Sequence, residues 1–229
     1  VVKSLMYKHR IEKVLILDDK DKLVGLITMK DIEKSIDYPL ASRDVEGRLI
    51  VGAAIGVGKD LASRAKKLAA AGVDVFILDS AHGDSKGVIE AVKFIKKEYP
   101  SIDVVAGNVA TAAGAKSLIK AGADAIMIHS KSNSPDEIVN FCKSFKTLNK
   151  QVPLVVAPST YATISEDQLI EHGIKMVIYA NHLIRSAFPA MVETARSILK
   201  EGRCYEASER YCMPIGEILN LVPEATLQS

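Results

Sequence analysis

Tryptophan is absent from the sequence, and aromatic residues make up only 5% of it. Proteins that bind single-stranded nucleic acid stack bases on aromatic side chains, so this scarcity argues against such a surface. The net charge is also small, at +2 from 30 Lys plus Arg and 28 Asp plus Glu. The excess of positive charge that would favour nucleic acid or an anionic membrane as a partner is therefore missing. We expect neither partner, and a charged ligand has to be met by a local site.

Long apolar runs are missing as well. None approaches the ~18 residues that a membrane-spanning helix needs, and the start of the chain lacks the layout of a signal peptide. The three cysteines, Cys142, Cys204 and Cys212, are an odd number without C-x-x-C spacing. We interpret them as reduced thiols, neither paired nor bound to metal. Together these absences predict a cytoplasmic protein.

What the sequence does contain is an alternation of strands and helices. Hydrophobic residues are 48% and charged residues 25% of the 229 residues, as in a packed globular protein. From about residue 50 onward, short runs rich in Val and Ile alternate with segments of helical period, which is typical of parallel strands buried on both faces. Six strands are predicted, over residues 51–56, 74–79, 103–108, 124–130, 153–158 and 175–181. Six helices are predicted between and after them, over residues 60–71, 86–99, 111–121, 134–146, 165–172 and 183–200.

An internal repeat supports this interpretation. Residues 69–80, 119–130 and 170–181 share one design, in which a helix ends at a glycine (Gly72, Gly122 or Gly173) just before a buried strand. Repeated β-α units of this kind form a closed barrel or an open sheet. The predicted fold is α/β, a TIM-barrel-like (β/α) repeat with six recognisable strand-helix units, which are two fewer than a closed barrel has. The two open edges would be covered by the N-terminal strands or a partner chain, or left exposed.

The two ends of the chain do not follow this alternation of strands and helices. Residues 12–18 and 23–28 read as two strands of a hairpin between two helices. We predict an N-terminal segment over residues 1–47, a barrel-like domain over 48–202 and a helical C-terminal extension over 203–229. The extension carries an apolar stripe of Ile215, Ile218, Leu219 and Val222. Such a stripe packs either on its own barrel or between subunits of a homo-oligomer.

Polar residues follow the predicted strands almost every time. In parallel α/β folds ligands meet the carboxyl ends of the strands, so five polar strand ends in a row favour a binding site. For any single position, capping of the following helix is the simpler interpretation. The glycine-rich stretch 52–58 matches neither G-x-G-x-x-G nor a P-loop. No nucleophile-base-acid triad can be assembled, so the catalytic residues are unknown.

Residues 11–125 resemble IMP dehydrogenase. The segments IEKVLILDDKDKLVGLITMKDIEK, GRLIVGAAIGVG, ILDSAHGDSKGV and VVAGNVATAAGAKSLIKAGADA follow one another as in that family. The first 47 residues resemble the end of a CBS module, in which Thr28 and Asp31 would contact a nucleotide or, as we favour, cap a helix. The resemblance implies NAD as cofactor, faced by Asp79, Ser80 and Asn108. The reactive-cysteine loop and the phosphate loops of that family are missing, since Cys142 falls within a predicted helix.

Residues 122–223 resemble phosphoenolpyruvate mutase of the isocitrate lyase superfamily. GADAIMIHSK, SPDEIVNF, VPLVVAPSTY, GIKMVIYANHLIRSAFPAM and IGEILNLVPE carry this resemblance. It implies that His129 approaches the substrate, and we include Ser130, Ser159 and Asn181 in the substrate-binding set. It also implies Mg²⁺, although the carboxylates that bind it are not recognisable here. We place the junction of the two families within residues 120–128.

Three hypotheses for function follow. The first is a barrel-type protein that binds a phosphorylated or nucleotide ligand at the strand ends, with neither parental catalytic site complete. The second is a structural or engineered chimera without activity. The third is residual activity of one parent, as an NAD-dependent oxidoreductase or a phosphomutase.

Overall fold

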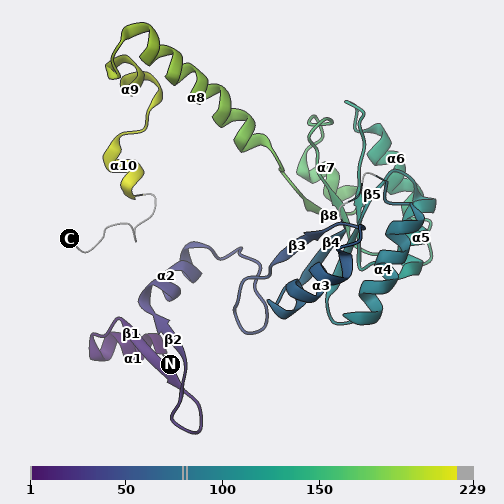
Figure 1. Cartoon of the computed structure of the whole chain (residues 1–229), viewed down its shortest axis with the longest axis horizontal. Coiled ribbons are helices and arrows are strands. Elements are labelled where there is room, and N and C mark those ends of the chain that lie inside the picture. Colours follow the sequence, from purple (N-terminus) through teal and green to yellow (C-terminus); the bar gives the residue numbers. More distant parts are fainter. Residues whose placement is uncertain (1, 79, 81, 221–229) are drawn as a thin grey trace. The chain divides into compact units, whose positions relative to one another are not determined.

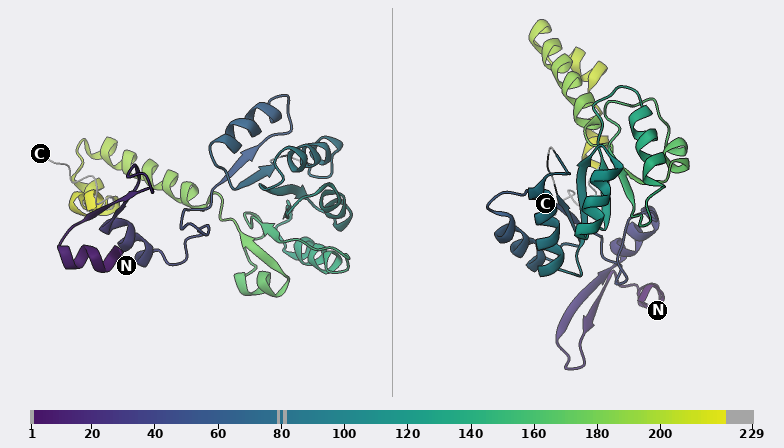
Figure 2. Two further views of the ribbon diagram at one scale, coloured as in Figure 1. Left: turned by 90° about the horizontal axis from the view of Figure 1, so that it is seen from below. Right: turned by 90° about the vertical axis from the view of Figure 1, so that its right-hand side faces the viewer.

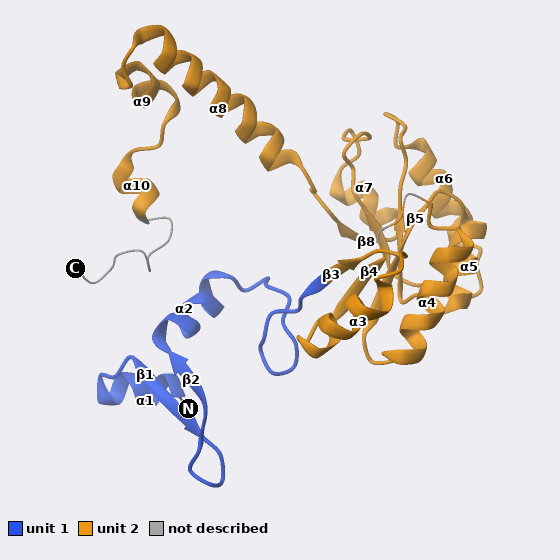
Figure 3. Ribbon diagram, viewed as in Figure 1, with its two compact units in different colours: residues 1–52 blue, residues 53–229 orange. Residues whose placement is uncertain are grey.

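The computed structural model describes residues 2–78, 80 and 82–220. The chain divides into two compact units, residues 1–52 and residues 53–229 (Figure 3). The predicted boundary lies after residue 47, and the boundary between these two units lies after residue 52.

Unit 1 is built around an antiparallel hairpin (Figure 1). Its elements are α1 (Val2–His9), β1 (Lys13–Leu17), β2 (Leu23–Thr28) and α2 (Met29–Asp37). The predicted hairpin between two helices is confirmed. Among the described residues of this unit, Met6 is the one hydrophobic residue that is buried. Leu15 and Leu26 face each other across the hairpin, and both are exposed.

A capping box begins α2. The Thr28 side chain accepts a hydrogen bond from the backbone N–H of Asp31, and the Thr28 backbone N–H donates to Oδ2 of Asp31 at 2.9 Å. Each residue thereby satisfies a backbone donor that the first helical turn leaves free. The helix-cap interpretation of Thr28 and Asp31 is confirmed.

Unit 2 contains a six-stranded sheet whose strand order follows the chain order, β3-β4-β5-β6-β7-β8. The pairings from β4 to β8 are parallel. Helices α3 to α7 lie along the outer side of the curved sheet (Figure 2). The elements are β3 (Gly52–Ile55), α3 (Leu61–Ala70), β4 (Val75–Leu78), α4 (Lys86–Glu98), β5 (Asp103–Val109), α5 (Ala112–Ala121), β6 (Ala125–Ile128), α6 (Asp136–Phe145), β7 (Leu154–Val156), α7 (Glu166–Glu171) and β8 (Ile174–Val177).

The glycines of the repeat serve the turns between helix and strand. Gly72, Gly122 and Gly173 have φ values of 82°, 112° and 90°. This left-handed backbone region is strained for residues that carry a Cβ. The repeated glycine is therefore explained by backbone geometry, and the predicted α/β repeat of six strands is confirmed.

The hydrophobic core lies between the sheet and its helices. Phe76 of β4, Val104 of β5 and Ile126 of β6 are fully buried and belong to this core. The alternate residues of the same strands, such as Ile77 and Met127, point to the other face and are only half-buried. A closed barrel fills its interior with layers of side chains. The inner face of this sheet is therefore less completely covered than its outer face.

The edges of the sheet are β3 and β8. The N-terminal strands β1 and β2 pair with each other in a two-stranded sheet of their own, so they do not add a strand to either edge of the larger sheet. Both edges carry exposed apolar residues, for instance Val51 just before β3 and Met176 within β8. Edge strands of this kind are prone to pairing with another chain.

Three helices follow β8: α8 (His182–Glu201), α9 (Tyr205–Tyr211) and α10 (Ile215–Asn220). The 20-residue α8 has no buried residue. Ile184, Phe188, Met191 and Ile198 follow one another along it at intervals of four, three and seven residues, and all are exposed. Ile215, Ile218 and Leu219 of the predicted C-terminal stripe are also exposed, and Val222 lies outside the described residues. In the described part of the chain, no helix is both long enough and apolar enough to cross a membrane.

Candidate functional site

The polar residues predicted from the sequence follow strands whose carboxyl ends lie along one edge of the sheet. Ser80 follows β4, Asn108 is the second-last residue of β5, and His129 follows β6 directly. Ser159 and Asn181 come after β7 and β8. Asp79 lies outside the described residues.

Backbone hydrogen bonds connect the ends of β4, β5 and β6. The Asn108 N–H donates to the carbonyl of Ser80 at 3.4 Å, and the Gly83 N–H donates to the carbonyl of Asn108 at 2.9 Å. The His129 N–H donates to the carbonyl of Val109 at 3.1 Å. The loop after β4 is thus laid along the end of β5, and the structure brings Ser80, Asn108 and His129 to neighbouring positions.

This arrangement depends on a close approach of backbones at Gly83. A Cβ at Gly83 would lie 2.8 Å from Cγ1 of Val109 and 2.9 Å from the carbonyl oxygen of Asn108. Both distances are shorter than packed atoms tolerate, so a larger residue would push the loop away from β5. Gly83 therefore positions the loop that carries Ser80.

The side chains at these strand ends differ in burial and in hydrogen bonding. The Asn108 amide is half-buried and has no hydrogen-bond partner among the described residues, while His129 is exposed. The Ser80 hydroxyl bridges its own loop, with the His82 N–H donating to it at 3.3 Å. An amide and a hydroxyl supply both donors and acceptors, which suits a neutral polar group of a ligand.

Ser130 has a different environment. It is buried, and its hydroxyl donates to the Glu137 carboxylate and accepts from the Ser132 N–H. Its carbonyl accepts from the Thr160 hydroxyl at 3.3 Å, which links the ends of β6 and β7. The Ser130 side chain is thus engaged in holding the loop before α6. Sequence reasoning missed Glu137, whose position in the first turn of α6 looks like an ordinary helix-start carboxylate.

At the end of β8, Asn181 and His182 are half-buried. Their atoms Oδ1 and Nδ1 are buried without a hydrogen-bond partner among the described residues. The ring of His182 meets that of Tyr179 edge to face at 5.8 Å, and the Tyr179 hydroxyl donates to Glu166 at 2.7 Å. No hydrogen bond among the described residues joins the Asn181 or Ser159 side chain to Ser80, Asn108 or His129. The structure therefore gives two groups of strand-end residues.

No thiol stands at these strand ends in the described part of the chain. Cys142 is buried within α6, and burial raises its pKa to about 11. The thiolate, which is the nucleophilic form, is then scarce at neutral pH. Among residues 2–78, 80 and 82–220, no group of three His, Cys, Asp or Glu side chains lies close enough to hold a metal ion.

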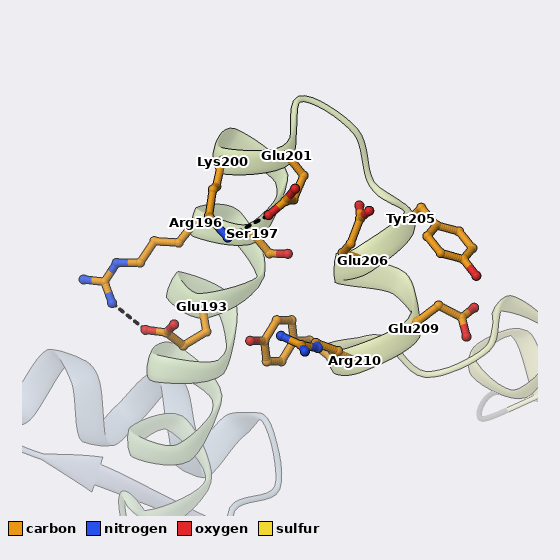
Figure 4. A pocket seen from close by; sticks show the side chains of 10 residues that line it. Glu193, Arg196, Ser197, Lys200, Glu201, Tyr205, Glu206, Glu209 and Arg210 are labelled. Atoms are coloured by element: carbon orange, nitrogen blue, oxygen red, sulfur yellow. Dashed lines mark hydrogen bonds and ion pairs between the residues drawn. The ribbon is translucent and has the colours of Figure 1, made fainter.

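A cavity of about 620 Å³ between α8 and α9 lies away from the strand ends in sequence (Figure 4). Its walls carry charges of both signs, many of which are already paired. Arg196 binds Glu193, and Lys200 lies 2.9 Å from Glu201. A surface whose charges already neutralise one another offers little to a charged ligand, so we do not include it in the candidate site.

Two family models match the chain. The IMP dehydrogenase / GMP reductase domain matches residues 6–133, and phosphoenolpyruvate phosphomutase matches residues 106–199. The chain thus has two segments of different resemblance. The overlap of the two matches contains the predicted junction at residues 120–128.

Curated relatives are similar to the first segment. Inosine-5'-monophosphate dehydrogenase of Bacillus subtilis is 52% identical over 125 residues, which are 55% of this chain and 26% of that protein. The same enzyme of Staphylococcus aureus (strain Mu50) is 56% identical over 125 residues, 55% of this chain and 25% of that protein. The chain spans about a quarter of the length of these relatives.

Solved structures of GMP reductase from Trypanosoma brucei are similar over more of the chain. The complex with guanosine 5'-triphosphate has a TM-score of 0.65 and 31% identity, and covers 77% of this chain and 45% of that one. A variant in complex with guanosine 5'-monophosphate also has a TM-score of 0.65, with 32% identity, and covers 79% of this chain and 40% of that one. The structural likeness therefore covers a larger share of the chain than the sequence similarity to the curated relatives does.

Proposed function

Because this chain belongs to the IMP dehydrogenase / GMP reductase family, we propose that it binds a purine nucleotide or a related phosphorylated ligand at the carboxyl ends of its strands. The relatives are named for inosine monophosphate, and the similar solved structures were obtained with guanosine nucleotides. The matched segment supplies β3 to β6, and hence the strand ends at Ser80, Asn108 and His129.

The observation that carries the proposal is the hydrogen-bonded contact between the ends of β4 and β5. The backbones of Ser80 and Asn108 fix each other, and the Asn108 amide is left without a partner among the described residues. A half-buried amide without a partner is costly unless water or a ligand satisfies it. This amide is therefore the best anchor for a ligand at the strand ends.

For the cofactor, we assign Asp79, Ser80 and Asn108 to NAD. The donors and acceptors of Ser80 and Asn108 fit the carboxamide of nicotinamide, which needs both. When bound, NAD supplies hydride transfer. The role of this chain's residues would be to hold and orient that group.

For the substrate side, we assign His129, Ser159 and Asn181 to direct contact, and Ser130 to support through Glu137. We propose binding without the turnover of either parent family. Cys142 is buried in α6 with a raised pKa, and so it is a poor nucleophile. The described strand ends also lack the grouped carboxylates that Mg²⁺ prefers. The two-segment composition is what a recombined chain would have, with a binding face inherited from both parents.

We further propose that the chain forms a homo-oligomer through α8. The apolar residues Ile184, Phe188, Met191 and Ile198 keep a spacing close to that of a coiled-coil seam, and all are exposed. Their spacing makes the surface suited to pairing with an identical helix, because the same stripe is presented by each copy.

Binding is tested by titrating the full chain with IMP, GMP, NAD, phosphoenolpyruvate and Mg²⁺ while its thermal unfolding is followed. A ligand at a hundred times its Kd stabilises the folded state by about 2.7 kcal/mol. We expect stabilisation by IMP, GMP or NAD, and loss of the stabilisation by NAD in Asn108→Ala. The control is Asn140→Ala, which removes an exposed amide from α6. Equal responses of the two variants, or no response to any ligand, would reject the proposed site and leave the inactive chimera as the better interpretation. Formation of NADH from IMP, or interconversion of phosphoenolpyruvate and phosphonopyruvate, would show that turnover is retained.

A further inference from the structure

A groove of about 420 Å³ lies between the second half of α5 and the loop that follows α6. Its basic rim is formed by Lys116, Lys120 and Lys150, and its apolar floor by Ile119 and Leu148. These residues precede β6 and β7 in the chain, so the groove is at the amino ends of the strands. The proposed nucleotide site is at the opposite ends.

The charge of this groove is of one sign. No carboxylate lines it, and none of its three lysines has an ion-pair partner among the described residues. Lys116 and Lys120 are four residues apart on one helix, where like charges repel by about 0.2–0.5 kcal/mol. Lys120 lies in the last turn of α5, where it complements the helix dipole. That explanation does not extend to Lys116, one turn earlier, or to Lys150, which belongs to another segment.

The loop side of the groove is held in place by hydrogen bonds. The Thr147 hydroxyl donates to the carbonyl of Ser144 at 2.7 Å, and the Leu148 N–H donates to the carbonyl of Phe145 at 3.0 Å. The Gln151 amide donates to the carbonyl of Lys146 at 3.1 Å. The loop therefore continues the end of α6 as a fixed turn, and it presents Lys150 and Leu148 without needing a ligand to order them.

We propose that this groove binds a small organic polyphosphate, meaning an apolar body that carries two or more phosphate groups. Three ammonium groups that have no ion-pair partner among the described residues match a multivalent anion. Leu148 is half-buried and keeps part of its side chain accessible, while Ile119 beneath it is almost fully buried, so Leu148 is the apolar contact that the floor offers to a ligand. The volume is that of a small-molecule site, which favours a small ligand over a folded protein partner.

The proposal is tested by isothermal titration of the full chain with inorganic tripolyphosphate and, separately, with hydroxypyrenetrisulfonate, a fluorescent trianion with an apolar body. The test variant is the triple change Lys116→Gln, Lys120→Gln and Lys150→Gln. The matched control changes three exposed lysines that do not line the groove, Lys66, Lys93 and Lys143, to Gln, with the same loss of net charge. We expect at least about a tenfold rise in Kd for the test variant, and less than about a twofold rise for the control.

Three results would overturn the proposal. Equal losses in the two triple variants would show that net charge, not the groove, binds the anion. Equal affinity for tripolyphosphate and the pyrene probe would remove the apolar part of the recognition. Binding of an acidic peptide more tightly than either probe, with loss in the test variant, would assign the groove to a protein partner. Since Asn108→Ala leaves this groove intact, failure here is distinguishable from failure of the proposed nucleotide site.

Discussion

The ammonium of Lys96, on α4, lies 2.9 Å from Oδ2 of Asp124, just before β6. The same carboxylate oxygen accepts from the Val104 N–H at 2.9 Å, and the same ammonium donates to the carbonyls of Pro100 and Ile102. One ion pair therefore fastens a helix to the first residues of two neighbouring strands. Asp124 lies where the two family resemblances overlap, so this pair joins the overlap to the segment before it.

We expect Lys96→Met to destabilise the chain by about 1–3 kcal/mol, because it leaves a half-buried carboxylate and two carbonyls without their donor. The measurement is urea-induced unfolding. Lys97→Met is the control, since the Lys97 side chain is 84% exposed and its removal should change stability by no more than about 0.5 kcal/mol. Similar urea midpoints for the two variants would contradict a stabilising role of the Lys96–Asp124 ion pair.

Gly83→Ala should both destabilise the chain and weaken ligand binding at the strand ends. The added methyl group would meet Val109 and the Asn108 carbonyl at distances that force the loop to move, at a cost of about 1–3 kcal/mol. Gly87→Ala, within α4, meets no atom within 4 Å and should stabilise by about 0.4–1 kcal/mol. Thermal unfolding with and without nucleotide separates the two effects. A Gly83→Ala chain as stable as the parent would show that the loop does not need this close approach.

The capping box of α2 makes a prediction about pH. Hydrogen bonds from the side chain and backbone of Thr28 lower the pKa of Asp31 below its usual value. Because the folded-state pKa is depressed, the stabilisation is present above the unfolded-state pKa and is lost as the pH falls through the folded-state pKa. Titration of Asp31 by NMR should give a low midpoint that rises in Thr28→Val. An unchanged midpoint in that variant would refute the assigned cause.

The three thiols should react at two different rates. Cys204 and Cys212 are exposed, while Cys142 is buried with its pKa raised to about 11. With a thiol-disulfide reagent at pH 8, two thiols should react quickly and the third only after unfolding. Cys142→Ala should leave the fast phase unchanged. Three fast thiols in the native chain would place Cys142 in a more open environment than α6 provides.

If α8 forms the interface of a homo-oligomer, a charge placed in that interface should lower the molecular mass of the protein in solution. Phe188→Glu puts a charge in the middle of the exposed apolar stripe and should dissociate the oligomer. Size-exclusion chromatography with light scattering measures this directly. Glu193→Gln, which lies off the stripe, is the control. A monomeric parent chain would rule out the oligomer.

Much of the fold could be predicted from local patterns. The six strands, the hairpin and the helices through residue 145 follow from runs of Val and Ile, helical periodicity and glycines such as Gly122, which are all local signals. The strand ends were predicted by the same logic, because a parallel sheet gathers Ser80, Asn108 and His129 at one edge. The hydrogen bond from Ser130 to Glu137 was not predicted, since it depends on how the loop between them folds back. The basic groove was missed because Lys116 and Lys150 are brought together only by packing of α5 against the end of α6.

The sheet order also bears on how the chain folds. Each strand of the larger sheet lies beside its immediate neighbour in sequence, and the order ends at β3 and β8. A closed barrel would have to join those two strands across the whole segment between Ile55 and Ile174, and the entropy lost in closing such a loop slows folding. In the described order no such step is required. The sheet can grow by adding one strand-helix unit at a time, in the direction in which a ribosome delivers the chain.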